Sequence, residues 1–166
     1  AGQPRIVAPL TTPDGTLLTL YGRSTVRCEK PLRHDFLPGA KGVFHASSLA
    51  HDHVVLIEGV FDTLACLAGG LQATGLCGVS IRDTWWRAIT ATHMTIAMDA
   101  DEAGQAAQSR LEDLAQTGVE AGKRITLLKP SALKGHNDLS EYWVNERSLP
   151  TTLLEPPTRY AAQESQ

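Results

Sequence analysis

The stretch MTIAMDADEAG at residues 94–104 decides the fold prediction. An apolar run at 94–98 is followed at once by Asp99 and Asp101, and then by a helical pattern of apolar residues that continues to residue 117. A short apolar run is typical of a buried strand. A strand that leads directly into a helix is typical of a sheet built from parallel β–α units.

The same order of elements recurs on both sides of this stretch. Apolar runs that read as strands alternate with segments that read as helices. The expected strands are 53–57, 72–77, 94–98 and 124–128, and the expected helices are 60–69, 82–90, 101–117 and 138–147. This alternation predicts an α/β fold, with a mainly parallel, Rossmann-like sheet flanked by helices.

The first part of the chain follows a different pattern. Residues 5–10 and 16–21 read as strands joined by the turn Thr12-Pro13-Asp14-Gly15, in which Pro presets φ and Gly accepts a positive φ. We therefore expect three parts. These are a small, mixed, β-rich basic N-terminal subdomain (1–47), the α/β domain (48–149), and a flexible tail or linker (150–166).

Charge is unevenly distributed along the 166 residues. The net charge is -3, yet residues 1–49 hold six of the fifteen basic side chains and three of the eighteen acidic ones. The total excludes a strongly basic nucleic-acid coat protein, whereas a basic part joined to an acidic part is a more specific clue than the total charge. No apolar run approaches the length of a membrane span. The three cysteines show no C-x-x-C spacing, which argues against structural zinc and favours a reducing, cytoplasmic location.

Acidic residues follow the predicted strands. Glu58 closes the strand at 53–57, Asp99 closes the strand at 94–98, and the acids Asp62, Asp101 and Asp138 lie close to the starts of the helices that come next. The carboxyl ends of parallel strands share one edge of a sheet, and Mg²⁺ prefers hard oxygen ligands. This pattern predicts a magnesium site. The alternative is that Asp101 only caps its helix and that Asp62 only adds a favourable charge to its first helical turn.

These residues also resemble a known family. Glu58-Gly59-x-x-Asp62 followed by Asp99-Ala100-Asp101-x-x-Gly104 is similar to the TOPRIM signature of topoisomerases, DnaG-type primases and some nucleases. Upstream, RIVAPL (5–10), Gly22-Arg23 and FLPGAKG (36–42) resemble the N-terminal subdomain of the RNA-polymerase domain of DnaG-type primases, including those of phages and mobile elements. The resemblance covers about residues 4–147.

The resemblance implies roles for individual residues. Glu58, Asp99 and Asp101 would be catalytic, and the metal ligands would be Glu58, Asp62, Asp99, Asp101 and Asp138. Arg23, Arg33 and Lys41 would bind nucleotide phosphates or the template backbone. The sequence departs from the family in its third acidic motif, where Asp138 stands alone after Gly135-His136-Asn137. The zinc-binding module of cellular primases is missing from the sequence, so we expect a catalytic-core fragment or a reduced primase.

The function implied is metal-dependent synthesis of short primers, with Mg²⁺ or Mn²⁺ as cofactor and no zinc in this chain. The implied partners are a single-stranded DNA template, nucleoside triphosphates, and a replicative helicase contacted through segments outside the chain. Two alternatives stay open. A TOPRIM nuclease would use the same acids for hydrolysis, and a non-catalytic module would bind DNA or a replication protein without metal chemistry. We also expect His51 and His53 to be surface or capping residues.

Overall fold

A parallel four-stranded sheet forms the centre of the larger part of the molecule. The computed structural model describes residues 3–77, 89–118 and 124–154. In spatial order the strands are β5 (Ala73–Gly75), β4 (His53–Ile57), β6 (His93–Ala97) and β7 (Arg124–Leu127), and every neighbouring pair is parallel. The prediction of a mainly parallel sheet is confirmed. The helix expected over 82–90 lies almost wholly outside the described residues.

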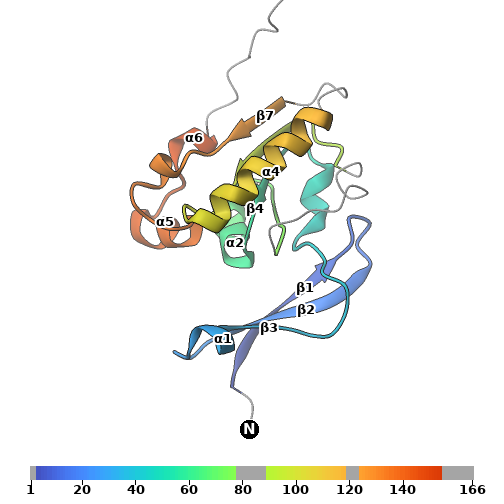
Figure 1. Ribbon diagram of the computed structural model, residues 1–166, viewed down its shortest axis with the longest axis vertical. Helices are drawn as coiled ribbons and strands as arrows, with labels where there is room; N and C mark the ends of the chain where they lie inside the picture. Colours follow the sequence, from blue (N-terminus) through green and yellow to red (C-terminus); the bar gives the residue numbers. More distant parts are fainter. Residues whose placement is uncertain (1–2, 78–88, 119–123, 155–166) are drawn as a thin grey trace, which may run out of the picture.

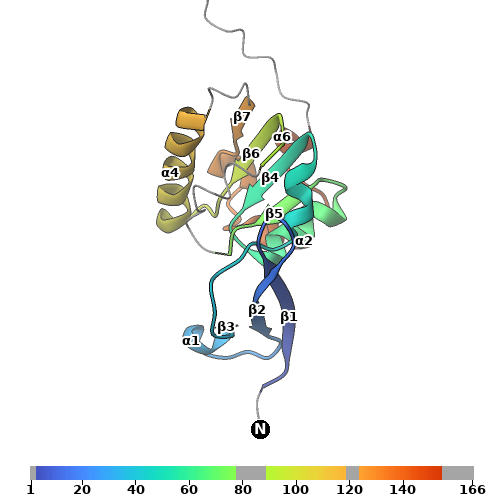
Figure 2. The ribbon, with the colours of Figure 1, turned by 90° about the vertical axis from the view of Figure 1, so that its right-hand side faces the viewer.

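Alternate residues of the strands feed two apolar cores, one on each face of the sheet. Val54 and Leu56 point towards α4 (Glu102–Gly118), which contributes Ala107 and Leu111. On the other face, strand residues pack against two helices and the end of the chain. These elements are α2 (Val60–Ala68), α5 (Leu139–Glu146) and α6 (Thr151–Leu154). Figure 2 shows α4 on one side of the sheet and α2 and α6 on the other.

The N-terminal part is a separate antiparallel sheet, which lies beside the α2 end of the larger part (Figure 1). Its strands are β1 (Arg5–Thr11), β2 (Leu17–Ser24) and β3 (His34–Phe36), in that spatial order, with a short helix α1 (Lys30–Arg33) before β3. The hairpin expected between β1 and β2 is confirmed, and Gly15 in its turn has a φ of 89°.

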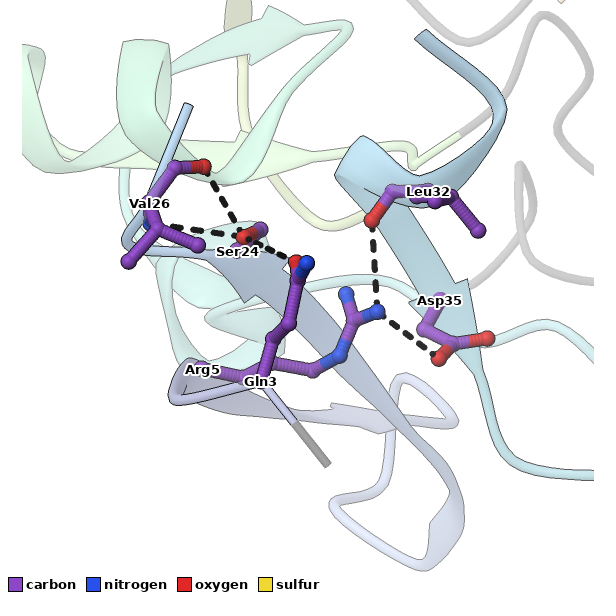
Figure 3. A network of polar contacts seen from close by, with 6 residues as sticks. All are labelled: Gln3, Arg5, Ser24, Val26, Leu32 and Asp35. Atoms are coloured by element: carbon purple, nitrogen blue, oxygen red, sulfur yellow. Dashed lines mark hydrogen bonds and ion pairs between the residues drawn. The ribbon is translucent and has the colours of Figure 1, made fainter. Parts of the chain in front are cut away.

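The two faces of this small sheet have different surroundings. On the inner face, Ala8, Leu10 and Tyr21 form an apolar cluster with Val60 at the start of α2. On the outer face, the Arg5 guanidinium donates to the Leu32 carbonyl and forms a 3.2 Å ion pair with Asp35 (Figure 3). The inner face therefore lies against the first turn of α2.

Backbone hydrogen bonds join the segment between the two sheets to both of them. Val43 exchanges two hydrogen bonds of 2.9 Å with Thr11 of β1, and Phe44 exchanges two with Gly75 of β5. At Gly42, an added side-chain carbon would lie 2.7 Å from the backbone of Leu10 and Thr11. The absence of a side chain at Gly42 therefore allows this segment to run close along β1.

The end of the described chain is packed rather than free. Leu149 and Leu153 are 3% and 2% exposed and belong to the same core as Tyr142. The expectation of a flexible tail from residue 150 is wrong for residues 150–154, because burial of Leu153 fixes α6 on the sheet. The boundary between the two subdomains at residues 47/48 stays a prediction. None of the described helices is long and apolar enough to cross a membrane.

Candidate functional site

The acids predicted from the sequence gather at the carboxyl edge of the parallel sheet. Glu58 follows β4 directly, and Asp99 follows β6 after one residue. Burial, and then the nearby carboxylates of Asp62, Glu58, Asp138 and Asp101, raise the pKa of Asp99 to about 8. The other four predicted acids therefore all act electrostatically on Asp99, as the shared edge predicts.

Two glycines allow the chain to approach these acids closely. A side-chain carbon at Gly59 would lie 2.5 Å from Oδ2 of Asp62, so glycine lets this carboxylate fold back over the turn between β4 and α2. A side-chain carbon at Gly104 would overlap the carbonyl oxygen of Asp99 and lie 2.8 Å from its amide nitrogen. The first turn of α4 thus packs directly on the backbone of Asp99, which explains the spacing of both motifs.

Three of the acids also have structural hydrogen bonds. Asp101 Oδ1 accepts a hydrogen bond from the Gly104 amide at 2.8 Å, so Asp101 does cap its helix, as the alternative interpretation predicted. Asp62 Oδ1 accepts from the Ser140 amide at 2.8 Å, and Asp138 Oδ1 accepts from the Glu141 amide and the Ser140 hydroxyl. Burial, and then Asp138, raise the pKa of Asp62 to about 6.

Ser140 is a residue that the sequence reasoning missed. Its backbone and side chain bind two different acids and so hold the start of α5 against α2. A signal was present in the sequence, because Asp138 and Glu141 have the spacing of a capping box. The Glu141 carboxylate accepts from the amide of Asn137 at 2.8 Å, one residue before the N-cap amide that this motif normally uses.

Glu58 and Asp99 lack such support from the described residues. Glu58 Oε2 is buried with no hydrogen-bond partner there, and burial, followed by Asp101, raises the pKa of Glu58. Within the same residues, no hydrogen bond reaches the carboxylate of Asp99. A buried carboxylate without donors is costly unless it binds a proton or a cation. Glu58 and Asp99 are therefore the acids whose carboxylate oxygens are available to bind a cation.

The residues fit a hard divalent cation bound in part by its substrate. Among described His, Cys, Asp and Glu side chains, no group of three is already arranged to hold a metal ion. Mg²⁺ is commonly bound through one or two carboxylates, with waters and substrate phosphates completing its shell. The unpartnered oxygen of Glu58 and the raised pKa of Asp99 match that mode of binding.

Two of the three predicted basic residues lie close to residues that adjoin the acids. The Arg23 guanidinium carbon lies 5.6 Å from the ring centre of Phe61, the residue before Asp62. Burial raises the pKa of Cys77 to about 12, and the positive charge of Lys41 acts against this rise, so Lys41 lies near Cys77. The Cys77 amide in turn donates to the Glu58 backbone carbonyl at 2.8 Å. Arg33 is exposed on α1, and no hydrogen bond or ion pair joins it to the site within the described part of the chain.

Comparisons with known proteins agree with this arrangement. A family model described as Toprim-like matches residues 55–143. The chain is similar to the Aquifex aeolicus primase (zinc-binding and RNA-polymerase domains), with 20% identity, a TM-score of 0.63, and 86% of this chain against 37% of that one covered. It is also similar to the E. coli primase catalytic core, with 18% identity, a TM-score of 0.64, and 86% against 48% covered.

A phage protein has the same architecture. The primase fragment of the bacteriophage T7 primase-helicase protein matches with 18% identity and a TM-score of 0.62, over 84% of this chain and 58% of that one. No curated protein matches the sequence. The chain spans less than half of the length of each of the two cellular primase structures. At these identities the likeness establishes the fold, which confirms the predicted α/β TOPRIM architecture with its preceding antiparallel part.

Proposed function

The chain belongs to the Toprim-like family, and on that premise we propose that it carries out metal-dependent nucleotidyl transfer, making short primers on single-stranded DNA. One observation carries the proposal. Two half-buried acids, Glu58 and Asp99, lie at the carboxyl edge of the sheet, and within the described residues Glu58 Oε2 and the Asp99 carboxylate have no hydrogen-bond partner. Arg23 and Lys41 lie close to Phe61 and Cys77, which adjoin these acids. A polymerase needs both, because it must hold cations and phosphate anions side by side.

Glu58 and Asp99 would hold Mg²⁺ or Mn²⁺, with Asp62, Asp101 and Asp138 adding negative charge around it. Such an ion neutralises substrate phosphates and stabilises the charge that develops on them during transfer. Asp62 and Asp138 keep their places through Ser140, so they would contribute mainly by their charge.

The chain's own side chains have separate tasks in this proposal. The 3′ hydroxyl of one nucleotide attacks the α-phosphate of the next, and pyrophosphate leaves. Glu58 would accept the proton of that hydroxyl, since burial raises its pKa towards the range useful for a general base. Arg23 and Lys41 would bind the triphosphate, because guanidinium and ammonium groups donate charged hydrogen bonds to phosphate oxygens. Arg33, exposed on α1, would contact the template backbone.

The proposed partners follow from this chemistry. They are single-stranded DNA and nucleoside triphosphates, with a replicative helicase contacted through segments outside the chain. The T7 protein, to which the fold is similar, is a primase-helicase protein by its own description.

The test is primer synthesis with a single-stranded template, labelled nucleoside triphosphates and Mg²⁺. We expect Asp99→Asn and Glu58→Gln each to reduce synthesis by about a thousandfold or more. Asp113→Asn is the matched control, because Asp113 is an exposed acid on α4. Synthesis that persists in both site variants contradicts the proposal.

The same preparation separates the two alternatives. Cleavage of labelled DNA in the absence of nucleotides, lost in Asp99→Asn, would identify a nuclease that uses these acids. DNA binding without either reaction, unchanged in Asp99→Asn, would identify a non-catalytic module.

A further inference from the structure

Arg23 is held by a neutral partner rather than by an acid. Arg23 on β2 and His34 on β3 are directly opposite each other in the antiparallel register. The Arg23 Nη1 atom lies 2.9 Å from His34 Nε2, and His34 Nδ1 lies 2.8 Å from the Tyr21 hydroxyl oxygen. Tyr21 and Arg23 are two residues apart on one strand, so both side chains lie on the inner face.

The direction of these hydrogen bonds fixes the protonation of His34. A guanidinium is only a donor, so Nε2 must be the acceptor and carries no proton. The proton of the neutral ring is then on Nδ1 and is donated to the Tyr21 oxygen. An imidazolium would present N–H groups on both sides and could not accept from Arg23. The geometry therefore selects the neutral Nδ1–H form.

The other arginine of this sheet shows the contrast. Arg5, on the outer face, has its charge compensated by Asp35 at 3.2 Å and donates to the Leu32 carbonyl (Figure 3). Arg23 forms no ion pair with any of the residues that the structure describes. Its other contacts are with the Tyr21 side chain, whose pKa it acts to lower, and with the face of Phe61, next to Asp62. The outer arginine is a structural cross-link, whereas the inner one keeps an uncompensated charge on the face that lies against the start of α2.

We propose that His34 is a positioning residue, which orients Arg23 towards the triphosphate of the incoming nucleotide while leaving its positive charge unpaired. The inference rests on the proposed function, because it gives Arg23 a phosphate ligand. A neutral acceptor restrains the guanidinium without competing for it. An acidic residue in the same place would restrain it equally well but would compete with the phosphate.

A matched pair of variants tests this distinction. His34→Gln keeps a neutral acceptor for Arg23, whereas His34→Glu offers an acceptor of the same size that carries a negative charge. The probe is a fluorescent ribonucleoside triphosphate with Mg²⁺, and affinity is measured by anisotropy. We expect His34→Gln to bind within about threefold of the wild type and His34→Glu to bind about tenfold more weakly. In synthesis assays His34→Glu should raise KM for the nucleotide with little change in kcat. Equal affinity of the Gln and Glu variants overturns the inference.

Two further measurements separate this inference from the proposed function. Arg23→Ala should weaken triphosphate binding by about tenfold or more. If it does so while the Gln and Glu variants bind equally, only the role of His34 fails; if Arg23→Ala has no effect, the phosphate role of Arg23 fails as well. Two-bond ¹H–¹⁵N spectra of the wild type read the His34 tautomer without any ligand. A proton on Nδ1 supports the inference, and a proton on Nε2 contradicts it.

Discussion

Both ends of the parallel sheet carry ionisable groups with shifted pKa values, which are acids at the carboxyl end and histidines at the amino end. At the carboxyl end, burial and like charges raise the pKa of Asp99 to about 8. At the amino end, His53 and His93 stack with ring centres 4.1 Å apart, and burial, followed by His53 and Arg124, lowers the pKa of His93 to about 4. In both places desolvation favours the neutral form of the group.

The two ends differ in how that cost is met. The histidines are neutral near pH 7 and their Nε2 atoms lie 2.9 Å from the hydroxyls of Thr95 and Thr126, although His93 Nδ1 is buried without a partner among the described residues. The acids repel one another, and hydrogen bonds from the described residues leave Glu58 Oε2 without a partner. A shifted pKa alone therefore does not identify a site. The candidate functional site is the cluster of acids, because nothing in the described fold compensates its charge. Four predictions test this contrast between the two ends of the sheet.

The largest expected effect is structural and lies at the carboxyl end. Gly104→Ala should reduce the free energy of unfolding by about 3 kcal/mol or more, because the new carbon would overlap backbone atoms of Asp99 that cannot move aside easily. Urea unfolding followed by circular dichroism measures it. Gly70→Ala is the control, since Gly70 has a φ of 84° but open space around it, and should cost only about 1 kcal/mol. Equal effects would show that α4 does not pack on Asp99 as described.

The second prediction concerns the charge of the acids. The folded protein keeps the Asp99 proton up to a pKa of about 8, against an ordinary value of 3.8. The stability that this proton provides is complete below pH 3.8 and is lost as the pH rises through about 8. Asp99→Asn should therefore raise the free energy of unfolding by about 1–2 kcal/mol at pH 8 and by little at pH 4. The metal-free protein is compared with Asp113→Asn at both pH values, and a loss of stability at pH 8 would contradict the prediction.

Most of the fold could be predicted because its signals are local. Apolar runs such as 53–57 and 94–98 predict buried strands, and the acids that follow them share an edge as soon as the strands are parallel. The described end of the chain could not be predicted in this way. Leu153 looks like part of a polar, proline-rich tail until the core of α5 is present to bury it.

Contacts between elements that are distant in the chain could not be predicted from the sequence either. His53 was expected at the surface or as a cap, but it stacks on His93, which is 40 residues away and aligned with it only by the register of β4 and β6. The roles of Ser140 and His34 depend in the same way on packing of α5 against α2 and on pairing of β3 with β2. No local pattern fixes such pairs.

The third prediction tests the amino end. The pKa of His93 falls from the ordinary 6.5 to about 4, so the stability that its neutral form provides is present above pH 6.5 and is lost as the pH falls through about 4. His93→Asn should reduce this acid sensitivity by about 1 kcal/mol between pH 7.5 and 5, measured as the difference in unfolding free energy from the wild type. A difference that does not change with pH would mean that His93 is not buried in its neutral form.

The smallest expected effect is stabilisation by Mg²⁺, and it separates the two ends most directly. An ion bound only to the folded acids should add about 0.8 kcal/mol at about three times its Kd, seen as a higher thermal midpoint. The gain should be larger at pH 8 than at pH 5, because protons compete with the metal for carboxylates whose pKa values are raised, as at Asp99 and Asp62. Asp99→Asn should lose most of the gain and His93→Asn should keep it. If the gain survived in Asp99→Asn or did not depend on pH, the ion would bind elsewhere, and the uncompensated charge at the carboxyl end would need a different ligand.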